Sequence, residues 1–365
     1  MNETYDVAVI GAGMAGASIA AELAPHARVL LIEAEDHPGY HATGRSAAFW
    51  EECYGGPDVV PLTLGSGPYL REHGMLSPRG ALYIGRDEDE PEIDAFIRRF
   101  ADSGVSIERL GRDALERRIP GIRSGWRHAI SEPACADIEV AALHQHYLAR
   151  ARERGVELHC RVRLEAANRE DAGWRLSFGA SGEARAQILV NASGAWADTV
   201  AGLAGARPLG IQPLRRTVIQ LRTAPQPPAD LPLVLDIAGA FYFKPEHGKL
   251  WLSPHDETAS PACDAAPEEL DVALAIDRFE QVADWRIEAV EHKWAGLRSF
   301  APDRLPVYGF EPRTPDFFWF AGQGGFGIQT APAAARLGAQ LLLGLPRDGM
   351  TEALDAALYA PQRFG

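Results

Sequence analysis

The stretch YDVAVIGAGMAG at residues 5–16, followed by an alanine-rich segment that ends at Leu23, decides the fold of this chain. The apolar, β-branched run predicts a buried strand, the closely spaced glycines predict a tight turn, and the alanine-rich segment has the composition of a helix. A lone GxGxxG motif is weak evidence, but a strand before it and a helix after it are the context that dinucleotide binding requires. The alternative is a glycine-rich turn that binds no ligand.

Each position of the turn has a separate expected role. Gly11 permits the turn, Gly13 lets the backbone approach a pyrophosphate, and Gly16 lets the helix pack close to the strand. Met14 and Ala15 lie at the helix N-terminus, where free N–H groups and a partial positive charge favour phosphates. We therefore expect these residues to hold a dinucleotide.

A second apolar run at residues 28–32 ends in Glu33, roughly 20 residues after Gly11. At this place the fold needs a carboxylate that accepts a hydrogen bond from a ribose 2′-hydroxyl. We expect Glu33 to fill this role, with Ala34 beside it. An acidic residue here disfavours the 2′-phosphate of NADP, so FAD and NAD remain.

The composition is that of a globular protein. The chain has 365 residues, of which 46% are hydrophobic and 24% charged, and this length predicts two domains or two interleaved lobes. The formal net charge of −14 argues against nucleic acid as a partner, because a phosphate backbone requires clustered Lys and Arg. An anionic small molecule is compatible with this charge if a few arginines converge in a cleft.

The four cysteines form no CxxC or Cys/His pattern and are scattered as Cys53, Cys135, Cys160 and Cys263. This spacing predicts no disulfide framework and no metal site, and it favours the reducing cytoplasm. The N-terminus is acidic and runs directly into the first strand, so we expect no signal peptide. The apolar stretch at residues 328–345 contains Arg336 and several uncharged polar residues, so we expect no transmembrane segment.

Hydrophobic periodicity predicts further elements along the chain. Helices are expected at residues 92–103, 112–118, 137–154 and 267–282, with Asp137 as the N-cap of the third. Strands are expected at residues 76–84, 126–132, 156–162, 174–178, 184–191, 216–221, 233–236, 241–244, 250–253, 291–300 and 317–321. The alternation within residues 210–255 indicates a mainly antiparallel sheet.

Two more segments of small residues follow predicted strands. In NASGAWAD, at residues 191–198, the backbone at Ala192, Gly194 and Trp196 is expected to lie against a flat ligand or a phosphate. GQGGFG, at residues 322–327, is a second glycine loop that enters a helix. A plain NAD dehydrogenase has no need of this loop. A flavin does, because a helix N-terminus stabilises the negative charge of the reduced ring.

Several segments together resemble the D-amino-acid oxidase superfamily of flavoenzymes. They are YDVAVIGAGMAGASIA at 5–20, HATGRSAA at 41–48, LVNASGAWAD at 189–198, WAGLRSF at 294–300 and AGQGGFGIQT at 321–330. Within the superfamily the chain is most similar to bacterial D-arginine dehydrogenase, and the likeness covers essentially the whole chain.

The resemblance implies an α/β fold, α+β overall, with two domains. A Rossmann-like FAD-binding domain would be assembled from residues 1–50, 137–208 and 294–365, and an antiparallel-sheet substrate domain would be inserted as residues 51–136 and 209–293. By position, Gly44, Arg45, Ser46 and Ala47 would contact the pyrophosphate and flavin, and Val162 would lie near the adenine. Beside the isoalloxazine we expect Gly324, Gly325, Phe326, Gly327 and Ile328. Gly296 and Arg298 are also expected to bind the cofactor.

A noncovalent FAD is expected. In the sarcosine-oxidase branch of the superfamily the flavin is attached to a cysteine near the C-terminal region. In this chain no cysteine lies beyond Cys263, so the resemblance implies no such attachment.

The same resemblance places a carboxylate clamp for the substrate at Arg216, Tyr242 and Arg298. Guanidinium donors bind a carboxylate with a geometry and strength that lysine cannot match. Arg215 is adjacent to Arg216 on one predicted strand, so its side chain points to the opposite face and is expected to be structural.

Two positions of the expected catalytic site depart from D-arginine dehydrogenase. Phe49 stands in place of a histidine, and Ala81 in place of a glutamate that holds the substrate's guanidinium, whereas the lid tyrosine is retained as Tyr54. A cation without its partner is costly in a low-dielectric pocket, so arginine is disfavoured. Glu51 and Glu52 on the expected lid could restore some preference for a cation.

The leading hypothesis is oxidation of an apolar or aromatic D-amino acid by hydride transfer from Cα to flavin N5. The imino acid then hydrolyses to a 2-oxo acid and ammonia. The alternatives are a 2-hydroxy acid or a secondary-amine acid as substrate, and a flavin-binding protein without turnover. The sequence leaves open whether O₂ or a quinone accepts the electrons.

Overall fold

The computed structural model describes residues 3–365, so residues 1 and 2 of the expected first domain segment lie outside the description. Its eight-stranded sheet is built on β1 (Thr4–Ile10), which pairs in parallel with β2 (Val29–Ile32) and with β12 (Glu183–Asn191). β9 (Glu157–His159) lies parallel to β2, and β20 (Phe317–Ala321) lies parallel to the end of β12. The opening strands predicted from the sequence are confirmed.

Antiparallel strands complete this sheet. β10 (Ala166–Glu170) pairs with β11 (Gly173–Ser177), which pairs in turn with β12, and β19 (Val307–Phe310) pairs with β20. The β11–β12 pair confirms the hairpin predicted from residues 174–178 and 184–189.

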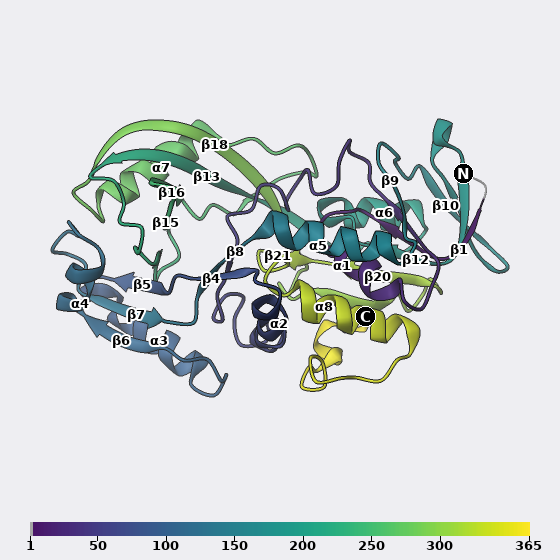
Figure 1. Cartoon of the computed structure of the whole chain (residues 1–365), viewed down its shortest axis with the longest axis horizontal. Coiled ribbons are helices and arrows are strands. Elements are labelled where there is room, and N and C mark those ends of the chain that lie inside the picture. Colours follow the sequence, from purple (N-terminus) through teal and green to yellow (C-terminus); the bar gives the residue numbers. More distant parts are fainter. Residues whose placement is uncertain (1–2) are drawn as a thin grey trace.

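Helices bury both faces of the sheet. On one face, α1 (Met14–Leu23), α5 (Val140–Glu153) and α8 (Ala331–Leu343) lie next to one another over Val7 and Val9 (Figure 1). On the other face, α6 (Ala197–Leu203) packs against a core that contains Ala8 and Ile10. These alternating residues of β1 point to opposite faces, which explains why this strand is apolar throughout.

The α1 helix packs closely on the strand before it, as predicted. A Cβ at Gly16 would lie 1.7 Å from the carbonyl oxygen of Gly11, so no larger residue fits there. Close packing of this kind brings the N-terminus of α1 to the end of β1, where the site lies.

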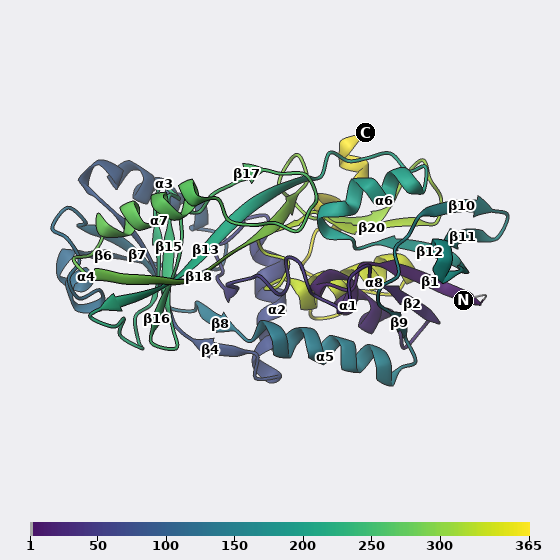
Figure 2. The same cartoon turned by 90° about the horizontal axis from the view of Figure 1, so that it is seen from above.

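The second large sheet has ten strands and is mainly antiparallel, as predicted. Its long strands β13 (Gln212–Ala224) and β18 (Arg286–Phe300) pair with each other and run toward the first sheet (Figure 2). Its remaining strands are β5 (Ala81–Gly85), β6 (Glu108–Gly111), β7 (His128–Glu132), β14 (Leu233–Asp236), β15 (Tyr242–Glu246), β16 (Lys249–Ser253), β17 (Thr258–Ala259) and β21 (Gln323–Gly324). The exception to the antiparallel order is the parallel pair of β5 and β14.

Smaller elements complete the chain. A three-stranded sheet contains β3 (Phe49–Trp50), β8 (Ala136–Ile138) and β4 (Leu76–Pro78). The other helices are α2 (Val60–Glu72), α3 (Glu90–Phe100), α4 (Arg112–Arg118) and α7 (Glu269–Glu280). Short 3-10 helices are η1 (Asp87–Asp89), η2 (Gly179–Ser181), η3 (Gly194–Trp196), η4 (Ala356–Tyr359) and η5 (Pro361–Phe364).

Two predictions about elements were wrong. The single strand expected at residues 76–84 is divided into β4 and β5, because the N–H groups of Arg79 and Gly80 both turn to the carbonyl of Cys135. The helix expected from Asp137 begins at Val140 instead. Asp137 lies in β8, and its carboxylate pairs with Arg79 and with Lys244 rather than capping the helix.

The expected domain boundaries cut through structural elements. The boundary between residues 293 and 294 lies inside β18, and α2, within the expected substrate segment, packs against α8 of the first sheet. We propose that the two-domain division holds, with β13, β18 and α2 as shared connections. Among residues 3–365, no helix is both long and apolar enough to cross a membrane.

Candidate active site

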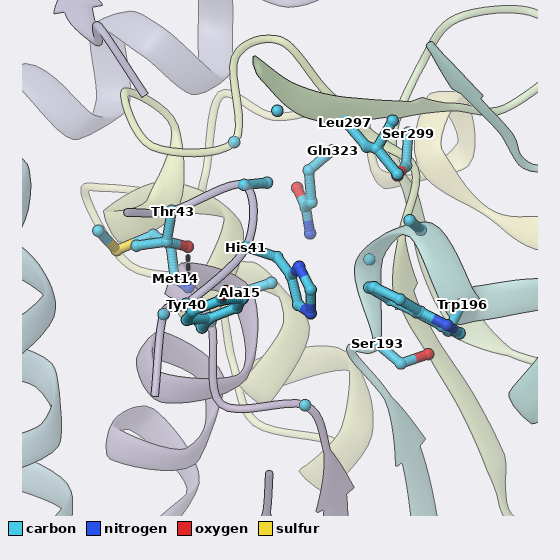
Figure 3. A pocket seen from close by; sticks show the side chains of 18 of the residues that line it. Met14, Ala15, Tyr40, His41, Thr43, Ser193, Trp196, Leu297, Ser299 and Gln323 are labelled. Carbon is cyan, nitrogen blue, oxygen red and sulfur yellow. Dashed lines mark hydrogen bonds between the residues drawn. The ribbon is translucent and has the colours of Figure 1, made fainter. Parts of the chain in front are cut away.

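A cavity of about 460 Å³ lies where β1, β2 and β12 end and where β13, β15 and β18 approach them (Figure 3). Most of the sequence-predicted site residues line it. They are Gly11, Gly13, Met14, Ala15, Glu33, Ala34, Arg45, Ser46, Ala47, Val162, Ala192, Gly194, Trp196, Arg216, Tyr242, Gly296, Arg298, Gly324, Gly325, Gly327 and Ile328. Residues distant in sequence therefore share one site.

The glycine turn allows close backbone approach at one end of this cavity. Gly11 has φ +97°, and a Cβ there would lie 2.6 Å from the carbonyl oxygen of Ala192. At Gly13 a Cβ would lie 3.2 Å from Oγ1 of Thr43, which accepts a hydrogen bond of 2.9 Å from the N–H of Met14 (Figure 3). Thr43 was not predicted as a site residue, because the sequence does not indicate which group a hydroxyl in a loop will bind.

Glu33 is held rigidly beside the turn. Its two carboxylate oxygens accept hydrogen bonds of 3.0 Å from the N–H groups of Ala12 and Glu35. The Glu33 carbonyl accepts a bond from the N–H of Val162, which brings Val162 to the same place. A carboxylate offers about four acceptor sites, so a ribose hydroxyl can still be bound there.

An aromatic pair crosses the cavity, and its histidine was not predicted from the sequence. The rings of His41 and Trp196 face each other (Figure 3), with centroids 4.6 Å apart. The His41 Nε2 lies 3.0 Å from the carboxylate of Glu35. Tyr40 stands edge-on to His41 with a centroid distance of 5.0 Å. These rings offer flat apolar surface to a dinucleotide.

The guanidinium of Arg45 is bound by other residues of the protein. It donates to the carbonyls of Ala265, at 2.7 Å, and Ala295, at 3.2 Å, and it forms an ion pair with Asp264. The Arg45 carbonyl accepts a bond of 2.9 Å from the indole of Trp294. Arg45 thus joins its loop to the second sheet, and its expected contact with a cofactor stays a prediction.

The second glycine loop also lines the cavity. Gly324 has φ +54°, and a Cβ at Gly325 would lie 1.8 Å from the hydroxyl oxygen of Tyr54. The Gln323 side chain accepts a bond of 2.7 Å from Tyr308, while its buried Nε2 has no partner among the described residues. An unpaired buried donor is costly, so this amide suits a ligand acceptor.

The loop does not lead straight into the helix as expected. α8 begins at Ala331, after turns that include residues 328–330, and the N–H of Ala333 in its first turn donates to Ser66 at 3.1 Å. Within the part of the chain that the structure describes, Phe326 packs against Val59 and Phe300 instead of lining the cavity. Two other predicted cofactor residues that lie outside the lining are Gly16 and Gly44.

Three predicted carboxylate-binding side chains converge on the cavity from neighbouring strands. Arg216 on β13 lies opposite Gly296 on β18, and Arg298 is two residues further along β18. Tyr242 enters from β15, and both it and Arg216 are buried. Among residues 3–365, no atom accepts a bond from Arg216 Nη1. Burial, together with the charge of Arg298, lowers the pKa of Arg216 to about 10, so an anion here would relieve an unfavourable charge.

Arg215 has the structural role that was predicted. It faces away from the clamp and pairs with the carboxylates of Glu268 and, at 2.9 Å, Asp271 on α7. The side chains of these two adjacent arginines therefore point to opposite faces of the sheet.

The three remaining catalytic predictions have different outcomes. Tyr54 accepts a hydrogen bond of 2.5 Å from Arg298 Nη1, so it reaches the clamp. Phe49 packs edge-on against Tyr242, with a centroid distance of 5.7 Å. Ala81 is buried in the same apolar cluster as Phe49. Of the described residues that line the cavity, none is Tyr54, Phe49 or Ala81.

Buried carboxyl groups lie close to this apolar cluster. Glu132 is the cross-strand neighbour of Ala81 and accepts bonds from the N–H groups of Glu52, at 2.7 Å, and Cys53, at 3.3 Å. Burial raises the pKa of Glu132 to about 7 and that of Glu52 above its ordinary value. For Glu51, burial and then the charge of Glu132 raise the pKa well above the usual range.

His255 is a neighbour of the clamp that was not predicted. Its ring lies 5.8 Å from that of Tyr242, and its Nδ1 lies 2.7 Å from the carbonyl oxygen of Gly239. Burial and the adjacent arginines lower the pKa of His255 to about 3, so the ring is neutral and adds no charge to the clamp.

The family model of the DAO FAD-dependent oxidoreductases matches residues 6–341. The chain belongs to this family. A glycine oxidase from Pseudomonas aeruginosa is 26% identical over 97% of this chain and 98% of its own. Among solved structures, L-proline dehydrogenase from P. horikoshii has a TM-score of 0.86 at 22% identity, covering 100% of this chain and 98% of that one.

A second solved structure shares the fold of this DAO-family chain. Glycine oxidase from Geobacillus kaustophilus has a TM-score of 0.84 at 22% identity and covers 99% of both chains. The family model confirms the predicted superfamily and the dependence on FAD, and the two solved structures confirm the mixed α/β fold. The expected closeness to D-arginine dehydrogenase stays a prediction.

The cavity of this DAO-family chain fits FAD. The backbone of Gly11 and Gly13 lines the cavity at the N-terminus of α1, where N–H groups favour a phosphate, and the Glu33 carboxylate beside it can accept a bond from a ribose hydroxyl. At the second glycine loop, the unpartnered Nε2 of Gln323 offers a donor to a polar ring edge, next to the backbone of Gly324 and Gly325. These residues would hold the adenosine end and the flavin end, respectively.

Proposed function

We propose that this chain oxidises the Cα–N bond of a D-amino acid to an imino acid, which hydrolyses to a 2-oxo acid and ammonia. The observation that carries the proposal is the clamp of Arg216, Arg298 and Tyr242 in the cavity that the glycine loops also line. A substrate held by its carboxylate there would have its α-carbon at the flavin end of the cavity. The names of the relatives, glycine oxidase and L-proline dehydrogenase, support an amino acid as substrate.

The protein's own residues contribute binding and orientation. Bound FAD supplies the two-electron acceptor that takes the α-hydrogen as hydride. Arg216 and Arg298 neutralise the substrate carboxylate, and the hydroxyl of Tyr242 supplies a further donor. Because Arg216 and Tyr242 are buried, these contacts form in a water-poor environment where charge-assisted bonds are strong. An amine that binds deprotonated requires no side chain as a base.

We propose that the substrate side chain is apolar or aromatic. Phe49 and Ala81 belong to an apolar cluster that also contains Tyr242 of the clamp. Burial raises the pKa values of the carboxyl groups of Glu51 and Glu52, and among residues 3–365 neither of these two side chains lines the cavity. A guanidinium would therefore lose its hydration without a charged partner.

A 2-hydroxy acid or a secondary-amine acid is the second candidate. The clamp recognises the carboxylate alone, and both of these classes carry one. The fold shared with L-proline dehydrogenase, whose named substrate is a cyclic secondary amine, favours the latter. We propose O₂ or a quinone as electron acceptor and, on the scattered cysteines of the sequence, the cytoplasm as location.

The proposal is tested by anaerobic titration of the holoenzyme with a panel of D-amino acids, L-amino acids and 2-hydroxy acids. Bleaching of the flavin absorbance by D-amino acids supports the proposal, and bleaching by 2-hydroxy acids alone favours the second candidate. A flavin that no compound of the panel bleaches would indicate a flavin-binding protein without this turnover. Repeating the active cases in air distinguishes an oxidase from a dehydrogenase.

A further inference from the structure

The turn after β16 accepts hydrogen bonds from one edge of the Arg216 guanidinium. Arg216 Nε donates to the carbonyl of Asp256 at 2.7 Å, and Nη2 donates to the carboxylate of Glu257 at 3.3 Å. These two nitrogens form one edge of the planar group, so only the other edge can serve a ligand. Nη1 on that edge is buried and has no partner among residues 3–365.

The turn itself is fixed by bonds on both sides. The carboxylate of Asp256 accepts from the N–H of Thr217 at 2.7 Å and from its hydroxyl at 3.0 Å. His255 has φ +55°, a left-handed conformation that costs a β-substituted residue on the order of 1 kcal/mol. This conformation is retained because the ring is bound to Gly239 and the backbone N–H to Ser253.

Glu257 is held in turn by Arg304. The Arg304 guanidinium donates to the same Oε1 of Glu257 at 2.8 Å and lies 4.0 Å from the ring centroid of Phe300. The Glu257 side chain is 35% exposed, whereas that of Arg216 is 3% exposed. The Glu257 carboxylate is therefore partly exposed to solvent, while the arginine that it binds is buried.

We propose that Glu257 is a positioning residue for substrate recognition: it holds the outer edge of Arg216 so that Nη1 is presented to the substrate carboxylate. The inference rests on the proposed function, because it assigns a task to the carboxylate clamp. It adds a residue that does not line the cavity and that no motif of the sequence marks.

Two opposing effects must be separated in a test. Removing the charge of Glu257 strengthens the attraction of the clamp for any anion, whereas removing its acceptor takes away the partner of Arg216 Nη2 and leaves the outer edge held by the Asp256 carbonyl alone. Glu257→Gln and Glu257→Ala lose the same charge, but the glutamine retains a carbonyl oxygen for Nη2. The ratio of ligand affinities between these two variants therefore measures positioning alone.

The neighbouring arginine provides a matched control. Glu268 pairs with Arg215 on the opposite face of the same strand, as Glu257 pairs with Arg216. Glu268→Gln and Glu268→Ala should bind carboxylates with equal affinity, because Arg215 does not face the cavity.

The experiment titrates each holoenzyme with benzoate and with benzamide, its neutral isostere, and follows the flavin absorbance. We expect Glu257→Ala to bind benzoate about fivefold or more weakly than Glu257→Gln, as the loss of one charge-assisted bond implies. Benzamide should show no such difference. In Arg216→Lys backgrounds the difference between the two Glu257 variants should disappear.

Equal benzoate affinities for Glu257→Ala and Glu257→Gln would overturn the positioning role and leave the proposed clamp intact. A difference that persists in Arg216→Lys would also overturn it, because Glu257 would then act elsewhere. A natural protein whose flavin spectrum benzoate does not perturb would refute the clamp and this inference together.

Discussion

Arg298 Nη1 donates to the hydroxyl of Tyr54 at 2.5 Å, across 244 positions of the chain. The contact depends on Gly325, because a Cβ there would lie 1.8 Å from the Tyr54 oxygen and 3.0 Å from Arg298 Nη1. The second glycine loop thus lines the cavity and also leaves space for the pair that completes the clamp.

Replacing this glycine should disturb the clamp. Gly325→Ala is expected to weaken benzoate binding by about tenfold or more, because Tyr54 and Arg298 cannot both keep their places. Gly349→Ala is the control, since no heavy atom lies within 4 Å of a Cβ at that position. Flavin absorbance titrations measure both, and equal affinities would exclude the steric role of Gly325.

Loss of the Arg298 guanidinium should weaken substrate binding and leave FAD binding unchanged. Arg298→Met removes a charge-assisted contact worth on the order of 3 kcal/mol, so substrate binding should weaken about 100-fold while FAD stays bound. Stopped-flow flavin reduction and the flavin content of the purified protein give the two readouts. Arg215→Met, on the opposite face, should lower stability without this loss. Unchanged reduction kinetics in Arg298→Met would remove the residue from the site.

The purified protein should be yellow and release its FAD on acid precipitation. The expectation rests on the glycine turn, on Glu33 and on the lack of a cysteine beyond Cys263. The supernatant should carry the flavin absorbance. A pellet that keeps its colour would show a covalent bond and contradict the prediction.

Burial of Glu132 makes the folded state less stable as the pH rises. Its pKa is about 7 in the folded protein and lower when unfolded, so between these values the folded state binds more protons. Stability therefore falls between about pH 5 and pH 8, by up to about 3 kcal/mol from this group. Glu132→Gln should reduce this fall, which thermal unfolding at several pH values measures. An unchanged pH slope in the variant would show that Glu132 does not titrate in this range.

Apolar and aromatic D-amino acids should reduce the flavin with a higher second-order rate constant than D-arginine or D-lysine. The reason is the apolar cluster of Phe49, Ala81 and Tyr242, of which Tyr242 lines the cavity: such surroundings offer a substrate side chain burial worth about 25 cal/mol per Å² but no charge. Stopped-flow comparison of D-phenylalanine, D-leucine, D-methionine and D-arginine decides this. If D-arginine is the fastest, Glu51, Glu52 or Glu132 supplies the carboxylate that position 81 lacks.

Local sequence patterns were sufficient to predict part of the fold and part of the site. The strand, turn and helix at residues 5–23 and the place of Glu33 follow from periodicity and glycine chemistry, and the structure confirms these elements. Arg215 could be separated from Arg216 because adjacent residues of a strand point to opposite faces.

Features that depend on distant pairing could not be predicted from the sequence. Asp137 has the composition signal of an N-cap, but it joins β8 because Arg79 and Lys244 reach its carboxylate from other segments. Glu132 stands beside Ala81 only through the register of β5 and β7. The bonds from the Arg45 guanidinium to carbonyls more than 200 residues away could not be predicted either.

The most direct test of the central claim compares D-phenylalanine with D-phenylalaninamide in anaerobic stopped-flow reduction of the holoenzyme. The two compounds differ in the carboxylate that the clamp of Arg216, Arg298 and Tyr242 would bind. We predict that D-phenylalanine bleaches the flavin and that the amide does so at least about 100-fold more slowly, since two charge-assisted contacts are lost. Equal rates for the two compounds would contradict the account, because they would show that the carboxylate is not recognised.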